Sequence, residues 1–266
     1  MSVEHGQNRL VTTLIGRSFV HPAFDYMLIG GGLSLVVAAI VWIMASPGDA
    51  FLVNAALLPF FILLSNSAHF AASTVRLYTK PDSLKMLPFL TMAFPLIAIA
   101  LLTLCLFQAG RWGPFLQALY LTWSPFHYAA QAYGLAVMYG FRSGCQLNPN
   151  DKRLLWWVCQ IPFFHTFIYG LEDGLRWLVS RETLDSLVVI NWLDQHHSAI
   201  TVVAFLVPLL LFVKVWRSSS GPLPLISMLA VVSNSIWWFV LTPLNAFVYA
   251  TIFHGIQYLA IVIIFH

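Results

Sequence analysis

Charged side chains are scarce in this sequence, and that scarcity decides the class of protein. Only 9% of its 266 residues are charged, 59% are hydrophobic, and the mean hydropathy is +0.80. A water-soluble domain carries roughly 25% charged residues, because it must cover a surface that faces water. A soluble globular protein is therefore excluded, and we expect an integral membrane protein.

Several other features are missing. The net charge of +3 gives no basic footprint of the kind that binds nucleic acid. The three cysteines show no CxxC spacing, and Cys105 and Cys159 lie in apolar runs, so we expect them to act as small buried hydrophobes. No internal repeat, low-complexity tract, soluble domain or cleavable signal peptide is evident. We therefore expect residues 1–266 to form a single transmembrane domain.

What the chain does have is a series of long apolar runs. A helix that spans a membrane needs about 20 mostly apolar residues. The sequence predicts an all-α, polytopic membrane bundle of about eight transmembrane helices with short connections. The eight predicted segments are 22–46, 51–79, 86–108, 113–141, 153–180, 197–216, 221–240 and 243–266.

The distribution of lysine and arginine predicts how these segments are oriented. If eight segments alternate across the membrane, ten basic residues fall on the side of the termini and three on the opposite side. Cytoplasmic loops carry an excess of basic residues. We therefore expect a bacterial inner membrane protein with both termini in the cytoplasm. The ten residues are Arg9, Arg17, Arg76, Lys80, Lys85, Arg142, Lys152, Arg153, Lys214 and Arg217; the three are Arg111, Arg176 and Arg181.

Histidines interrupt the apolar segments at similar depths. At about 1.5 Å of rise per residue, His69, His127, His165 and His254 fall close to the middle of a hydrocarbon core about 30 Å thick. A polar side chain at this depth is unfavourable unless it faces the bundle interior and finds a partner. Neutral imidazole is a common metal ligand. The alternative is that these side chains only link helices by hydrogen bonds.

Three of these histidines have a polar neighbour one helical turn away, in the stretches "SNSAHFAAS", "HYAAQAYG" and "FHGIQY". A histidine that binds a metal usually donates its second N–H to a nearby acceptor. His165 has no such neighbour, so we treat it as an additional ligand of lower rank. The predicted outer partners are Asn66, Gln131, Gln257 and Tyr258.

The first predicted segment adds one histidine and the one carboxylate inside a span. His21 and Asp25 are four residues apart and so share a helix face. Asp25 either orients His21 as a metal ligand or is an acid favoured by the amino-terminal helix dipole. The glycines of "IGGG" (29–32), and Gly134 below His127, predict close packing of helices around the site.

Four short motifs resemble the Brp/Blh-type β-carotene dioxygenases. They are the run from His21 to Asp25, the pair His69-Phe70, His127 with Gln131, and His254 on the last helix. This resemblance implies a polytopic membrane enzyme in which histidines hold a non-haem iron that uses O₂ to split carotenoids. The sequence departs from the family pattern at three places: Pro22 replaces a glycine, Ala71 and Ala72 replace Gly-Asp, and Gln131 replaces a second histidine.

Three kinds of function stay open at this point. The first is a metal-dependent oxygenase with iron, zinc or copper bound by His21, His69, His127 and His254, acting on a lipid-soluble isoprenoid or acyl substrate. The second is a non-catalytic membrane subunit of a homo- or hetero-oligomer, in which the histidines hold haem or a pigment or are structural. The third is a transporter, which paired carboxylates and an inverted repeat would favour; neither is evident.

Overall fold

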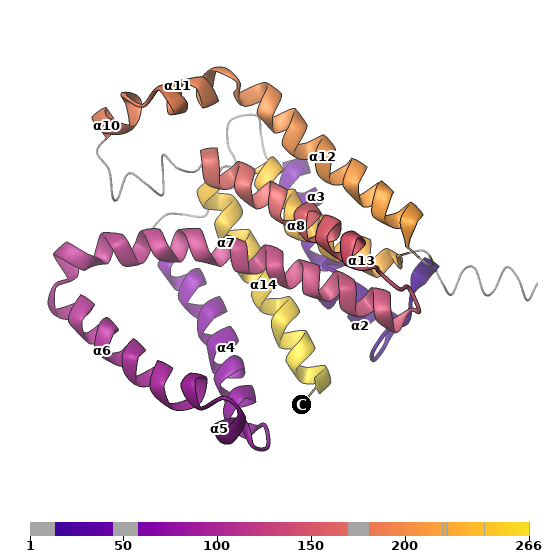
Figure 1. The fold of residues 1–266 in the computed structure, drawn as a ribbon, viewed down its shortest axis with the longest axis horizontal. Coiled ribbons are helices and arrows are strands. Elements are labelled where there is room, and N and C mark those ends of the chain that lie inside the picture. The colour runs from indigo at the N-terminus through magenta and orange to yellow at the C-terminus, as the bar shows by residue number, and fades with distance from the viewer. Residues whose placement is uncertain are drawn as a thin grey trace, which may run out of the picture.

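The computed structural model describes residues 14–44, 58–169, 181–219, 221, 223–241 and 243–265. Within these residues the chain forms helices and no β-strand (Figure 1). The predicted all-α class is confirmed for them. The short connection predicted between 22–46 and 51–79 lies outside the described residues, as do parts of the segments predicted at 22–46, 51–79, 153–180, 221–240 and 243–266.

Each predicted apolar segment contains at least one helix. Long apolar runs favour helices in a membrane because every backbone polar group must be satisfied within the protein. Two short π-helical turns, η1 and η2, lie near the starts of the first and third of these segments. The elements are α2 (Pro22–Phe24), η1 (Asp25–Ile29), α3 (Gly32–Met44), α4 (Leu58–Thr79), α5 (Ser83–Met86), η2 (Phe89–Ala93), α6 (Phe94–Phe107), α7 (Ala109–Arg142), α8 (Pro149–Tyr169), α10 (Arg181–Asp185), α11 (Val188–Gln195), α12 (His197–Ser218), α13 (Leu225–Val240) and α14 (Pro243–Phe265).

Some of these helices are long and apolar enough to cross a membrane. Three meet that test: Phe89–Phe107, His197–Ser218 and Asn245–Phe265. A fourth span results if Pro22–Ile29 and Gly32–Met44, which meet at a bend of 54°, count as one broken span. In the described part of the chain, α4, α7 and α8 do not meet the same test. Each of these three helices carries one of the mid-segment histidines, namely His69, His127 and His165.

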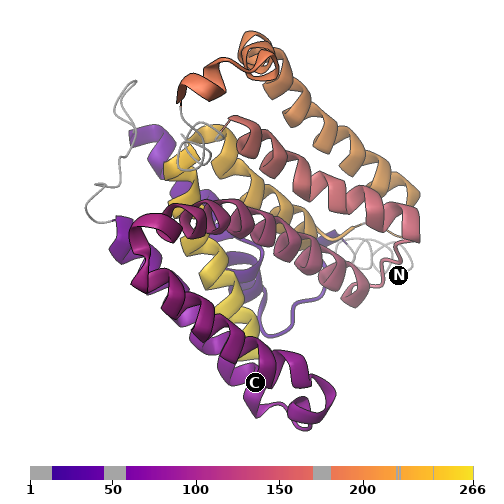
Figure 2. The same ribbon diagram turned by 60° about the vertical axis from the view of Figure 1, so that its left-hand side comes forward.

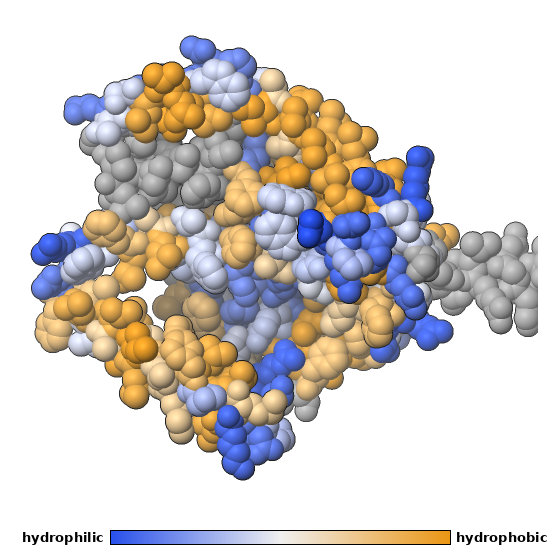
Figure 3. Space-filling model, in the orientation of Figure 1, coloured by the Kyte–Doolittle hydropathy of each residue, from blue (hydrophilic) through white to orange (hydrophobic). Residues whose placement is uncertain are grey.

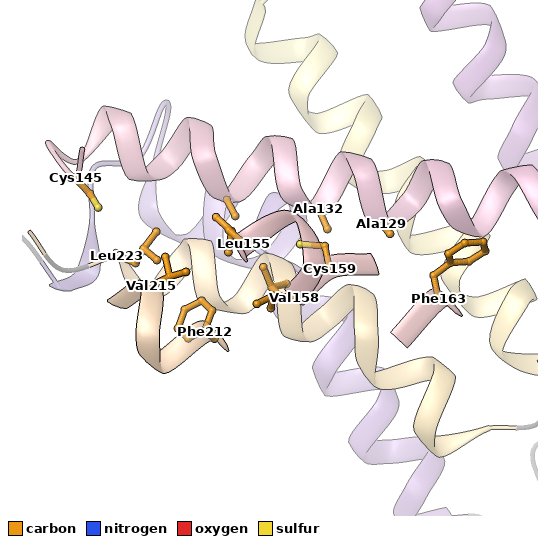
Figure 4. Close-up of a cluster of buried hydrophobic side chains, with 12 residues drawn as sticks. Ala129, Ala132, Cys145, Leu155, Val158, Cys159, Phe163, Phe212, Val215 and Leu223 are labelled. Carbon is orange, nitrogen blue, oxygen red and sulfur yellow. The ribbon is translucent and has the colours of Figure 1, made fainter. Parts of the chain in front are cut away.

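Helix α7 lies at the centre of the packing. It contacts α8 and α13, while α12 packs on the outer side of α8, and α14 contacts α4, α7 and α13 (Figures 1 and 2). Small side chains allow α7 and α8 to approach closely. In Figure 4, Ala129 and Ala132 of α7 face Cys159 and Phe163 of α8, and all four are buried. Cys105 and Cys159 were expected to be buried. Cys159 is buried, whereas Cys105 is half-buried.

Hydrophobic side chains cover much of the outer surface, as Figure 3 shows for α6 and α12. Helix α6 has no buried residue, and Leu106 and Phe107 at its end are 79% and 84% exposed. Water-soluble proteins rarely expose continuous apolar patches of this kind. The exposed surface of the described residues thus has the polarity of a protein surrounded by lipid.

Glycine allows the first segment to break. Gly31 has a φ of +81°, a conformation that other residues adopt at a cost, and a Cβ placed on it would lie 2.0 Å from Ser233 Oγ. The backbone groups freed by the break are satisfied, because Gln257 donates to the Ile29 carbonyl at 3.0 Å and Ser233 to the Gly30 carbonyl at 3.4 Å. The close packing predicted for "IGGG" is confirmed. For Gly134 it is wrong, since a Cβ there would meet no atom within 4 Å.

The variant Gly31→Ala is expected to lower the free energy of unfolding by at least about 2 kcal/mol. A left-handed backbone conformation costs an L-residue roughly 1–2 kcal/mol, and the clash with Ser233 adds to that. Adding Ser233→Gly should recover part of the loss. Gly134→Ala is the control and should not destabilise the protein, because alanine is favoured over glycine within a helix. Thermal unfolding of the purified protein in detergent would measure all four, and equal stability of wild type and Gly31→Ala would contradict the described break.

Candidate metal centre

Three helices bring three of the predicted histidines together. His69 comes from α4, His127 from α7 and His254 from α14, and one ring nitrogen from each lies within 4.8 Å of those of the other two. A glycine lets α14 approach α4 at this level. A Cβ on Gly255 would lie 2.9 Å from the Ser65 hydroxyl oxygen, one turn before His69. The sequence thus predicted convergence of these three imidazoles, and the structure brings them to one place.

Two of the three ring spacings match ligands on adjacent positions of one ion. Imidazole nitrogens bind metals at about 2.0–2.1 Å, so ring centres lie about 4.5–5.2 Å apart on adjacent positions and about 6.3 Å apart on opposite ones. The ring of His254 lies 4.9 Å from that of His69 and 4.9 Å from that of His127. The rings of His69 and His127 are 5.9 Å apart. A shift of about 1 Å by one ring would bring all three to the adjacent spacing.

The hydrogen bonding of the histidines also fits a bound metal. Among the described residues, Nδ1 of His69 and both ring nitrogens of His254 are buried without a hydrogen-bond partner. A buried polar atom left in this state costs about 1–3 kcal/mol. Metal coordination would satisfy one nitrogen on each ring. His127 is more exposed than the other two, so the group opens toward the surface on its side.

Two tyrosines fix the rings of the two buried histidines. The ring of Tyr258 lies edge-on to His69 with centroids 4.1 Å apart, and Tyr128 lies 4.3 Å from His254. Both hydroxyls are anchored. Tyr258 Oη is 2.9 Å from Ser73 Oγ, and Tyr128 Oη is 2.7 Å from Thr251 Oγ1. These contacts hold the imidazoles in place without using their nitrogens.

The amides predicted as outer partners contact backbone and hydroxyl groups instead of imidazole nitrogens. Gln131 donates to the carbonyl of His254 at 3.3 Å, and Asn66 donates to the hydroxyl of Tyr120. Gln257 reaches away from the group to the Ile29 carbonyl. Of these three side chains, Gln131 therefore lies closest to the predicted role, because it fixes the backbone of a candidate ligand.

His21 and His165 lie outside the group of three. His21 is exposed at the start of α2, where its Nδ1 accepts a hydrogen bond from the Ala23 N–H at 3.2 Å. His165 lies on α8 with Nε2 2.9 Å from Thr201 Oγ1, and its ring stacks on Phe239 at 5.5 Å. The structure therefore brings together three of the five histidines that the sequence singled out.

Asp25 does not orient His21. Its carboxyl group is fully buried and accepts hydrogen bonds from the N–H of Phe19 at 2.5 Å, the N–H of Val20 at 3.3 Å and the hydroxyl of Tyr139 at 2.8 Å. These bonds tie the segment before α2 to the carboxyl end of α7. Asp25 does lie in the first turn of η1, as the second interpretation expects, but neither interpretation predicted that its carboxyl group would anchor the segment before α2.

Tyr128 and Thr251 were not among the residues predicted for the site. Each carries a signal that a turn-by-turn reading could have used: Tyr128 directly follows His127, and Thr251 lies three residues before His254. Thr251 therefore shares a face with that histidine.

Comparison with family models, with characterised proteins and with solved structures gives no match. The residues of the site therefore carry the functional argument by themselves.

Proposed function

We propose that this protein is an integral membrane metalloprotein in which His69, His127 and His254 hold one metal ion. The observation that carries the proposal is the convergence of three imidazoles from three helices. Two of them, His69 and His254, have buried ring nitrogens with no hydrogen-bond partner among the described residues. Burying such polar groups without a partner costs free energy. Binding a metal ion recovers it.

The proposed metal is iron. Three neutral imidazoles leave coordination positions open, which suits iron in oxygen chemistry and also accommodates zinc or copper. A haem fits this group poorly, because the ring of His254 lies 4.9 Å from the rings of both His69 and His127. Those two rings are 5.9 Å apart, near the about 6.3 Å of opposite axial ligands, but His254 would then lie at the level of the porphyrin. The non-catalytic, haem-binding subunit is therefore the weaker of the two principal alternatives.

The proposed reaction is an O₂-dependent oxidation of a lipid-soluble isoprenoid or acyl substrate. The bound metal would supply activation of O₂. The resemblance of the histidine motifs to the Brp/Blh-type β-carotene dioxygenases supports this class of reaction. The protein would admit the substrate on the more exposed side at His127, and the hydroxyls of Ser73 and Tyr258 beside His69 would orient a polar end.

The proposed setting is a bundle of eight membrane segments with both termini in the cytoplasm of a bacterial cell. Ten basic residues on one side against three on the other support this orientation. The α7 end at Arg142 and the α8 start near Lys152 then lie on the cytoplasmic side. Lipids are its immediate partners.

Metal analysis of the purified protein, together with its absorption spectrum, tests the proposal. We expect about one iron ion per chain and no intense haem band, because three imidazoles in this arrangement make one site. A haem band would favour the haem-binding alternative. Protein that retains no metal after purification without chelators would contradict the proposal. Stoichiometric zinc or copper would support the metal site but contradict the proposal that the metal is iron.

A further inference from the structure

A groove lies at the junction of α7 and α8, far along α7 from the histidine group. Its volume is about 460 Å³. The last two turns of α7 provide one wall, and the connection between the helices with the first turn of α8 provides the rest. Its lining includes Val137, Met138, Phe141, Leu147 and Lys152.

The groove is lined mainly by apolar side chains, with Gln146 and the cation Lys152 as its polar members. Val137, Met138 and Leu147 are half-buried, and Phe141 is 80% exposed beside them. Lys152 is exposed on the first turn of α8 and has no ion pair among the described residues, where the one salt bridge joins Lys85 and Asp82. The groove therefore combines a wall for a hydrocarbon chain with an uncompensated positive charge.

The charges around this end are strongly asymmetric. Arg142, Arg153, Lys214 and Arg217 are exposed at the ends of α7, α8 and α12, and Figure 3 shows hydrophilic residues gathered where these helices meet. The acid nearby, Asp151, is buried and accepts a hydrogen bond from Ser218 at 2.6 Å. Arg142 is engaged with the carbonyl of Ser18 and the ring of Phe19. Lys152 is thus the cation best placed to meet a ligand in the groove.

We infer that this groove binds an anionic phospholipid, with an acyl chain against α7 and the phosphate at Lys152. An exposed apolar wall that ends in a cation suits a molecule with a hydrocarbon chain and an anionic head. Basic residues at a membrane surface attract anionic lipid by about 1 kcal/mol each. The inference rests on the proposed membrane embedding of the chain and is independent of the metal.

The test compares phosphatidylglycerol with phosphatidylcholine as spin-labelled lipids in vesicles that contain the full-length protein. The wild type should prefer phosphatidylglycerol about fivefold, the ratio that corresponds to about 1 kcal/mol. Lys152→Glu should abolish the preference. Lys214→Glu carries the same charge change outside the groove lining and should retain most of it. Equal preference in Lys152→Glu and wild type would overturn the inference.

A second pair of variants tests the hydrocarbon wall. Val137→Trp fills the groove and should release the bound lipid, whereas Val213→Trp adds the same bulk on the exposed face of α12 and should not. Inorganic phosphate should compete poorly with the lipid. Full competition would identify a site for free phosphate and overturn the inference that the groove binds a phospholipid. Metal content should be unchanged in every variant, so failure here is distinguishable from failure of the proposed metal site.

Discussion

The variant His254→Ala is expected to reduce bound metal from about one ion per chain to almost none. The ring of His254 is the one that lies 4.9 Å from both others, while the remaining pair is 5.9 Å apart. Loss of an outer partner of a ligand typically weakens metal binding 10- to 100-fold, and loss of the ligand itself should exceed about 100-fold. His69→Ala should have the same effect. Metal analysis of protein from matched purifications measures both.

His165→Ala is the matched control for this prediction. His165 is as buried as His254, at 8% against 6% exposure, but it lies beside Thr201 and outside the group of three. The variant His165→Ala should therefore leave the metal content unchanged. A chelator should lower the melting temperature of the wild type and of His165→Ala but not that of His254→Ala, because a ligand stabilises the state that binds it. Full metal content in His254→Ala would contradict the proposal that His69, His127 and His254 bind one metal ion together.

Asp25→Ala is expected to destabilise the protein by about 3 kcal/mol or more. The change leaves the Tyr139 hydroxyl and the Phe19 N–H without their acceptor, and an unsatisfied buried donor costs about 1–3 kcal/mol. It also detaches the segment before α2 from α7. Thermal unfolding in detergent gives the change in stability, and limited proteolysis should show faster cleavage near residues 14–21.

Two milder variants separate the contributions at Asp25. Tyr139→Phe removes one donor together with its partner bond and should cost about 1 kcal/mol. Asp25→Asn keeps one acceptor oxygen, which can still receive the bonds now made to Oδ2, and should fall between the two. The bound metal should remain in all three variants. A stable Asp25→Ala protein, or one that loses metal selectively, would contradict the anchoring role.

The positions of the helices were predictable because they depend on properties that a sequence displays directly. Apolar runs of about 20 residues separated by short polar breaks specify helices in a membrane. The shape of the first segment was less accessible. Its break depends on contacts of Gly30 and Gly31 with Ile226, Ser233 and Gln257, which come from distant parts of the chain.

The candidate ligands were predictable in height but not in direction. Helical rise places His165 at the same level as the other three, yet it gives no information on which neighbouring helix the residue faces. Helix α8 turns His165 toward α12, where it meets Thr201. His21 precedes the first helical turn, so its ring serves the Ala23 N–H. The partners of long side chains were similarly inaccessible, since Gln131 and Gln257 reach carbonyls on other turns and helices.

The break in the first segment and the histidine group share one turn of α14. His254 and Gln257 are three residues apart. Gln257 donates a hydrogen bond to the Ile29 carbonyl at the point where the chain bends by 54°. If one half of the broken helix moves relative to the other, either the Gln257 hydrogen bond breaks or the turn of α14 that carries His254 moves with it. A change in the bend of the first segment would in this way alter the position of a candidate ligand.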